Sequence, residues 1–230
     1  MNPNLRKTRM QHTHAILGRP ALLALAGLTV LVAGTAAQAQ TSLHTLKAGV
    51  IRYDAHAKTD GIRGVGIPPG ADATVGDSTT LLLTYEYALS PQIGVEFVLG
   101  LPPKIKATAS GSVAFLGEVL TARSVSPTVL VNYHFFEPTA TVRPFVGLGF
   151  NYTAFTQARS PYGWDVSLSD SFGPAAHAGV NWAVGKQWGL FGSLGAARVR
   201  SKLTAVGATV LQTTIDFRPV TYSVGASYRF

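Results

Sequence analysis

Cysteine is absent from the 230 residues of the chain, which excludes a disulfide framework and a thiolate metal site. Acidic residues are also few, 11 against 19 lysines and arginines. This positive excess does not gather into a basic run with interleaved aromatic residues, which argues against nucleic acid as a partner. Beyond residue 40 there is no run of about 18 apolar residues, so a mature chain that crosses a membrane has to cross it with strands.

The first 39 residues have the pattern of a cleaved signal peptide. A basic segment precedes an apolar stretch at residues 21–34, and Ala37 and Ala39 supply the small-x-small pattern of a signal peptidase site. The apolar stretch is too short for a transmembrane helix, which needs roughly 20 residues. We therefore expect cleavage before Gln40 and a single mature domain at residues 40–230.

The last nine residues alternate between apolar and polar side chains up to a terminal aromatic residue. This pattern predicts a strand with Val224, Ala226, Tyr228 and Phe230 facing lipid and Arg229 facing a lumen. Outer-membrane β-barrels end on such a strand. We expect outer-membrane lipid to contact its outward face, and the barrel assembly machinery to bind Tyr228 and Phe230.

About eight segments of the mature chain alternate in the same way. Residues 80–89 and 93–101 are the clearest, and a short turn around Pro91 makes them a hairpin. The sequence therefore predicts an all-β fold, an eight-stranded antiparallel transmembrane β-barrel in the outer membrane of a Gram-negative bacterium. The alternative is a soluble lipocalin-like barrel with its apolar face inward.

Short and long connections alternate along these segments. Those near Pro91, Pro138 and Lys186 are short, whereas residues 55–78, 102–121, 155–171 and 201–212 are longer and rich in Gly, Pro, Ser and Thr. Tight periplasmic turns and long extracellular loops give outer-membrane barrels this asymmetry. We expect the four long segments to be extracellular loops.

Two places interrupt the alternation. Lys47 and Arg52 lie on opposite faces of the first predicted strand, and the alternation before Pro219 is out of phase with the alternation after it. A β-bulge would explain either one, and the edge of the membrane would also explain the change at Pro219.

The mature chain resembles the OmpW family of small outer-membrane proteins. The resemblance rests on residues 126–135 (SPTVLVNYHF), 144–153 (PFVGLGFNYT), 170–182 (DSFGPAAHAGVNW) and 216–230 (DFRPVTYSVGASYRF). It implies an eight-stranded barrel without a cofactor, whose narrow and partly apolar lumen passes small hydrophobic molecules, with exit sideways into the membrane. The chain departs from the family on its seventh strand, where small inward residues imply a wider lumen.

Strand parity predicts a lumen lined by both apolar and polar side chains. Its members are Leu82, Glu86, Glu96, Val98, Leu130, Asn132, His134, Phe145, Asn151, His177, Asn181, Phe191 and Arg229. Such a lumen is more apolar than a water channel needs, which favours transport of small hydrophobic solutes. The alternative is that these side chains only fill the barrel, with Arg229, or else Lys47, neutralising Glu86 or Glu96 as a buried pair.

Two other functions are compatible with a small barrel. A lipid-modifying enzyme would need a nucleophile and base, and His134 or His177 could serve as base. However, neither a Gly-x-Ser-x-Gly nor a His-Glu-x-x-His motif occurs, so we assign no catalytic residue. The two histidines come from non-adjacent strands with no carboxylate spaced as a co-ligand, so we assign no metal site. A structural or receptor barrel would act through the polar residues 55–78.

Overall fold

The structure is a computed structural model that describes residues 42–207 and 210–230. The chain divides into two units at residue 40, and the described residues belong to the second unit. The predicted signal peptide, with Ala37, Ala39 and Gln40 at its cleavage site, lies outside the described residues. That assignment stays a prediction.

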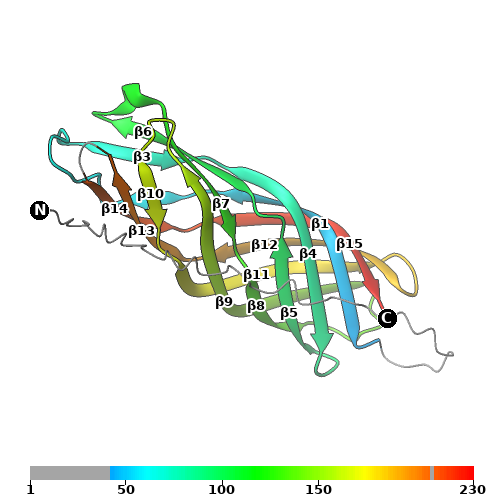
Figure 1. The fold of residues 1–230 in the computed structure, drawn as a ribbon. Coiled ribbons are helices and arrows are strands. Elements are labelled where there is room, and N and C mark those ends of the chain that lie inside the picture. The colour runs from blue at the N-terminus through cyan, green and yellow to red at the C-terminus, as the bar shows by residue number, and fades with distance from the viewer. Residues whose placement is uncertain (1–41, 208–209) are drawn as a thin grey trace, which may run out of the picture. The chain divides into compact units, whose positions relative to one another are not determined.

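Eight antiparallel strands close into a barrel (Figure 1). Each pairs with the next along the chain, β9 pairs with β11, and β1 pairs with β15 to complete the ring. The closed ring leaves no unpaired edge, as a strand-built membrane protein requires. The strands are β1 (His44–Asp54), β4 (Ser78–Ala88), β5 (Ile93–Gly100), β8 (Thr128–His134), β9 (Val142–Arg159), β11 (Ser171–Ala183), β12 (Trp188–Ala197) and β15 (Val220–Arg229). The predicted eight-stranded barrel is confirmed.

The end of the barrel at which Phe230 lies also carries the three short turns. We call it the turn end. The opposite end is built from shorter strands that continue the wall, which we call the distal tier (Figure 1). β7, β6 and β3 extend the sheet of the ring in that order from β9, and β10–β13–β14–β2 form a separate four-stranded sheet. Their bounds are β2 (Ala57–Thr59), β3 (Ala71–Val75), β6 (Lys104–Gly111), β7 (Glu118–Val125), β10 (Asp165–Leu168), β13 (Val199–Val206) and β14 (Val210–Phe217).

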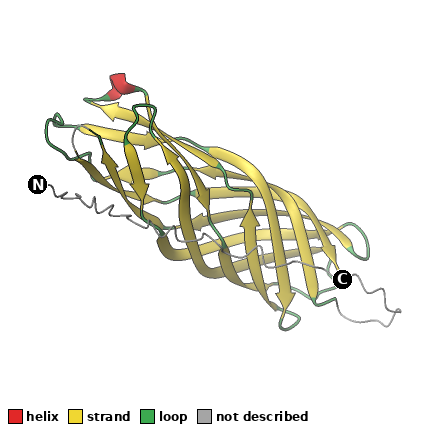
Figure 2. Ribbon diagram, viewed as in Figure 1, coloured by secondary structure: helices red, strands yellow, loops and turns green. Residues whose placement is uncertain are grey.

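The four long segments are therefore not simply loops, and the prediction was wrong in leaving these strands out. Paired strands make up most of the described residues of 102–121, 155–171 and 201–212, whereas 55–78 is mostly loop and contains the short strands β2 and β3. Figure 2 shows these strands beyond the ring, joined by loops. Within the described residues the single helical element is a 3-10 turn, η1 (Ala114–Leu116). No helix of these residues is long and apolar enough to cross a membrane. Two features concealed these strands in the sequence. The segments are rich in turn-forming residues, and the apolar residues of their strands alternate inward rather than outward.

This inversion appears where β14 meets β15. In the distal tier Ile215 and Phe217 face inward and are buried, while Arg218 is exposed. Beyond Pro219 the inward positions continue as Thr221 and Ser223, and the exposed positions become apolar. Inward parity is unbroken, so the bulge expected at Pro219 is wrong. The outward environment changes instead, as the membrane-edge alternative predicted.

The same change explains β1. Lys47 is buried in the lumen and Arg52 is exposed, yet β1 pairs continuously with both β4 and β15. The expected bulge is therefore wrong here too. Arg52 lies toward the distal tier, where it forms a 2.8 Å ion pair with Asp77.

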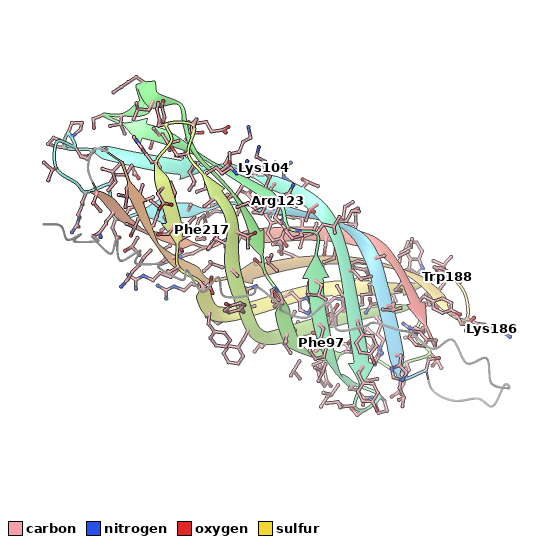
Figure 3. All side chains as sticks on the ribbon, in the orientation of Figure 1. Phe97, Lys104, Arg123, Lys186, Trp188 and Phe217 are labelled. Carbon is pink, nitrogen blue, oxygen red and sulfur yellow. The ribbon has the colours of Figure 1, made fainter. Side chains whose placement is uncertain are left out.

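The outer face of the eight-stranded ring is apolar, which rules out the soluble-barrel alternative. Leu81, Phe97 and Leu148 are exposed on it, and Figure 3 shows Phe97 on the outside of the wall. An aromatic cluster surrounds the turn end, where Trp188 lies 4.9 Å from Tyr228 between ring centroids. Aromatic girdles mark the membrane interfaces of such barrels.

Phe230 completes this cluster. Its ring stacks on His44 at 5.3 Å, and its backbone exchanges hydrogen bonds with His44 of 3.0 and 3.3 Å. Phe230→Ala retains the backbone bonds, so we expect a loss of only about 1 kcal/mol in unfolding free energy in detergent. If the assembly machinery binds this ring, the folded protein in cells should fall several-fold by heat-modifiability on gels. Phe97→Ala removes an equally exposed outward ring, and an equal fall in that variant would contradict the prediction.

Candidate functional site

Three cavities follow one another along the inside of the barrel. The distal cavity, about 90 Å³, lies in the distal tier among apolar side chains such as Ile62, Trp164 and Leu211. The central cavity, about 150 Å³, lies within the ring, and the turn-end cavity, about 280 Å³, opens beside Pro91 and Pro138. Val75 lines both the distal and the central cavity. A path for a solute has to connect these spaces.

The thirteen predicted lumen residues are divided between these spaces. Eight line the central cavity: Leu82, Glu96, Val98, Leu130, Phe145, Asn151, His177 and Phe191. Four line the turn-end cavity: Glu86, His134, Asn181 and Arg229. Asn132 is fully buried and lies between them.

A buried ion cluster separates the central cavity from the turn-end cavity. Lys47 Nζ lies 3.0 Å from Glu86 Oε2 and 3.1 Å from Glu96 Oε1, and only 2 % of the lysine side chain is exposed. Glu86 and Glu96 are direct cross-strand partners on β4 and β5. Two carboxylates in that position repel each other, and the ammonium between them offsets this repulsion.

Asn132 and two histidines complete the ion cluster. Asn132 Nδ2 donates to Glu96 Oε2 at 2.6 Å and to Glu86 Oε1 at 3.2 Å, and Asn132 Oδ1 lies 2.7 Å from His177 Nε2. His134 Nε2 bonds to Glu86 Oε1. Gly147 leaves the necessary room, since a Cβ there would lie 2.6 Å from His177 Nε2. Lys47, Glu86, Glu96, Asn132, His134 and His177 together form the ion cluster.

Two aromatic rings cover the ion cluster on its central-cavity side. Lys47 Nζ lies 5.0 Å from the ring centroid of Phe145 and 5.9 Å from that of Phe191. These are cation–π distances. The cluster therefore lies across the lumen between the two cavities, and Phe145 and Phe191 adjoin Lys47 on the side of the central cavity.

Arg229 is not the partner of either glutamate, and the prediction that named it first was wrong. Its Nη1 donates to the carbonyl oxygen of Pro138 at 3.3 Å. Arg229 pairs with Thr45 on β1, and Thr45 pairs with Glu86 on β4, so Arg229 lies two strands away, about 10 Å. The cation is Lys47, which lies on the strand next to that of Glu86. It is the alternative to Arg229 given in the sequence analysis.

The turn-end cavity is bordered by buried polar atoms without a partner among the described residues. Three buried side-chain atoms around it have no hydrogen-bond partner within the described part of the chain: His134 Nδ1, Arg143 Nε and Asn181 Oδ1. Buried polar atoms beside a space of this size are ordinarily satisfied by water. Water in this end of the lumen would satisfy these three atoms.

The central cavity is suited to an apolar solute. Most of its wall is apolar, including the rings of Phe155, Phe191 and Phe217. Serine and threonine hydroxyl groups are spread over the rest of the wall, and the ion cluster reaches it at Glu96 and His177. Ser193 and Gly195 also line it, which places the small residues of the seventh strand beside the open space.

The barrel wall beside the central cavity has a break in its hydrogen-bond ladder. Pairing of β5 with β8 ends at Val98–Thr128, and pairing of β6 with β7 begins at Lys104–Arg123. Among the described backbone hydrogen bonds, a single one joins the two strands between these points: Ser124 N donates to Pro103 O at 3.3 Å. The ladder break comprises residues 99–103 and 124–127.

Prolines cause the break, because Pro102, Pro103 and Pro127 have no N–H to donate. The central cavity reaches both sides of it, with Gly100 and Pro103 on one side and Ser126 on the other.

This architecture agrees with comparisons to known proteins. The model of the OmpW family matches residues 42–230, which include all of the described residues. The chain belongs to the OmpW family. Outer membrane protein W of Vibrio cholerae is 30 % identical over 168 residues, covering 70 % of this chain and 77 % of that protein. Like these relatives, this OmpW-family chain is an outer-membrane barrel, so the turn end is periplasmic and the distal tier is extracellular.

Two further matches extend the comparison. The dibenzothiophene metabolism operon protein PahQ of Pseudomonas aeruginosa is 30 % identical over 152 residues, covering 65 % of this chain and 70 % of that protein. The crystal structure of outer membrane protein OprG from Pseudomonas aeruginosa has a TM-score of 0.77 at 24 % identity, covering 81 % of this chain and 95 % of that one. The latter supports the fold.

Proposed function

We propose that this OmpW-family barrel takes up small hydrophobic molecules from outside the cell and releases them sideways into the membrane through the ladder break. One observation carries the proposal: the largely apolar central cavity reaches both sides of the break, while the ion cluster lies across the lumen below it. The distal cavity, which is almost entirely apolar in its lining, would receive the solute first.

The ion cluster makes a straight path unfavourable. An apolar solute moving past Lys47 would have to separate it from Glu86 and Glu96, and breaking a buried pair costs about 3–5 kcal/mol. In the turn-end cavity beyond it, the solute would also displace water from buried polar atoms that have no other partner among the described residues. Sideways release avoids both costs.

The size and chemistry of the central cavity indicate the solute class. An apolar cavity of about 150 Å³ holds a molecule as large as benzene. The relative PahQ is named for a dibenzothiophene metabolism operon, and dibenzothiophene is an apolar aromatic compound. Small aromatic or aliphatic compounds are therefore the solutes that we propose for this chain.

The proposal contains no catalytic step. His134 and His177 bond to Glu86 and Asn132, and among the described hydrogen bonds neither ring contacts a serine or threonine hydroxyl. For a receptor function, the polar segment 55–78 would be the binding loop, but part of it forms β2 and β3. Deleting that segment would therefore disturb the wall of the distal cavity as well.

Filling the central cavity tests transport directly. Ser193→Trp places a large side chain inside the cavity, and we expect uptake of a radiolabelled small aromatic compound by cells to fall about tenfold, because an eight-stranded lumen has little spare width. Leu194→Trp is the matched control, since Leu194 is the next residue on β12 and faces outward. A sugar of similar size should enter poorly in every case. Equal aromatic uptake in both variants would refute transport through this cavity.

A further inference from the structure

Two cations face each other on the outside of the distal tier. Lys104 on β6 and Arg123 on β7 are direct cross-strand partners, and both are exposed. Figure 3 shows them close together near the start of the distal tier. Like charges directly opposite each other in a sheet are destabilising. An anion bound between the two side chains would offset this repulsion.

Nearby acidic groups are already engaged by other cations. Glu118 pairs with Lys106 at 2.8 Å, and Asp77 pairs with Arg52 at 2.8 Å. Within the described residues no carboxylate lies within ion-pair distance of Lys104 or Arg123. Arg123 uses Nη1 to donate to Pro102 O at 3.2 Å, which fixes the guanidinium and leaves its other N–H groups free.

The position of Lys104 and Arg123 relative to the lipid-facing band indicates which anion they bind. Just below it the outward side chains are Leu99, Leu101 and Val125, which are exposed and apolar and so belong to the lipid-facing band. Lys104 and Arg123 are the first outward charges beyond them on these strands. In a bilayer, the phosphate groups of the lipids begin where the hydrocarbon ends.

We propose that Lys104 and Arg123 form a binding site for a phosphate group of a phosphorylated glycolipid in the outer leaflet. The planar guanidinium suits two phosphate oxygens, and the ammonium supplies a compact second charge. Acyl chains of the bound lipid would lie along Leu99, Leu101 and Val125, beside the ladder break. The proposal does not depend on transport.

The experiment measures binding of lipid A, a phosphorylated acylated disaccharide, to the purified full barrel in neutral detergent by native mass spectrometry and thermal shift. We expect Lys104→Gln/Arg123→Gln to weaken binding about 30-fold, from two lost surface contacts. Without lipid this double variant should melt at the same or a higher temperature, because the repulsion is gone. With lipid A the wild type should gain more stability than the variant.

The matched control, Arg198→Gln/Arg218→Gln, removes the same charge from another part of the distal tier, where both arginines share Asp216. It should retain binding within about twofold of wild type if the site is local. Dephosphorylated lipid A should not distinguish the proteins. Equal loss of binding in the control, unchanged binding in the Lys104→Gln/Arg123→Gln variant, or equal stabilisation by inorganic phosphate would each overturn the proposal.

Discussion

Lys47→Met is expected to lower the free energy of unfolding by roughly 3–5 kcal/mol, because it leaves two buried carboxylates facing each other without a cation. Methionine is close to lysine in length, so the loss should come from charge rather than from an empty space. Urea unfolding in lipid bilayers, followed by the fluorescence of the three tryptophans, measures it.

Two companion variants identify the cause. Lys47→Met/Glu86→Gln/Glu96→Gln removes all three charges and should recover most of the lost stability, since a neutral replacement of a buried pair is often tolerated. Arg229→Met removes a cation that reaches only the Pro138 carbonyl group, and should cost about 1 kcal/mol. If Arg229→Met were as damaging as Lys47→Met, the described cluster would be wrong.

Closing the ladder break with a disulfide is expected to lower uptake of a small aromatic compound about tenfold, if solutes leave between these strands. The native chain has no cysteine, so Leu101→Cys/Val125→Cys would contain a single possible bond. These two outward residues face each other when the Val98–Thr128 register is continued. A reductant should restore uptake in the same sample.

The control disulfide is Phe97→Cys/Val129→Cys, which joins outward partners in the intact ladder of the same two strands. Oxidation of this pair should leave uptake unchanged. The extent of each bond can be measured by blocking free thiols with a polymer that shifts the protein on gels. Full uptake through a completely oxidised Leu101→Cys/Val125→Cys variant would contradict sideways release at this place and would leave Ser193→Trp as the separate test of the lumen.

The strands of the ring could be predicted from the sequence because side chains two residues apart on a strand lie on the same face of the sheet. Leu82, Glu86 and Asn132 could be assigned inward from alternation alone. Which of them touch could not be predicted, because that depends on register between strands. Arg229 shares a level with Glu86 yet lies two strands away, whereas Lys47 is on the adjoining strand.

The distal tier was missed for a different physical reason. Apolar side chains face outward only where the outside of the barrel is lipid. Above the membrane, residues such as Ile215 and Phe217 face inward instead. The prolines at 102, 103 and 127 were available in the sequence as a signal for the ladder break. Their significance emerges only when the two segments are seen to oppose each other across the wall.

The reversal of polarity near Pro219 also fixes how deep the barrel sits. Arg52 and Arg218 mark one border of the apolar band, and Trp188 and Tyr228 mark the other. A shift inward by a single residue, about 3.3 Å, would start to draw a ring of cations toward hydrocarbon, where each can cost up to about 2–4 kcal/mol at the midplane. A shift outward would expose the leucines to water. The barrel is thus held at one depth, and the ladder break with its prolines stays level with the upper ends of the acyl chains.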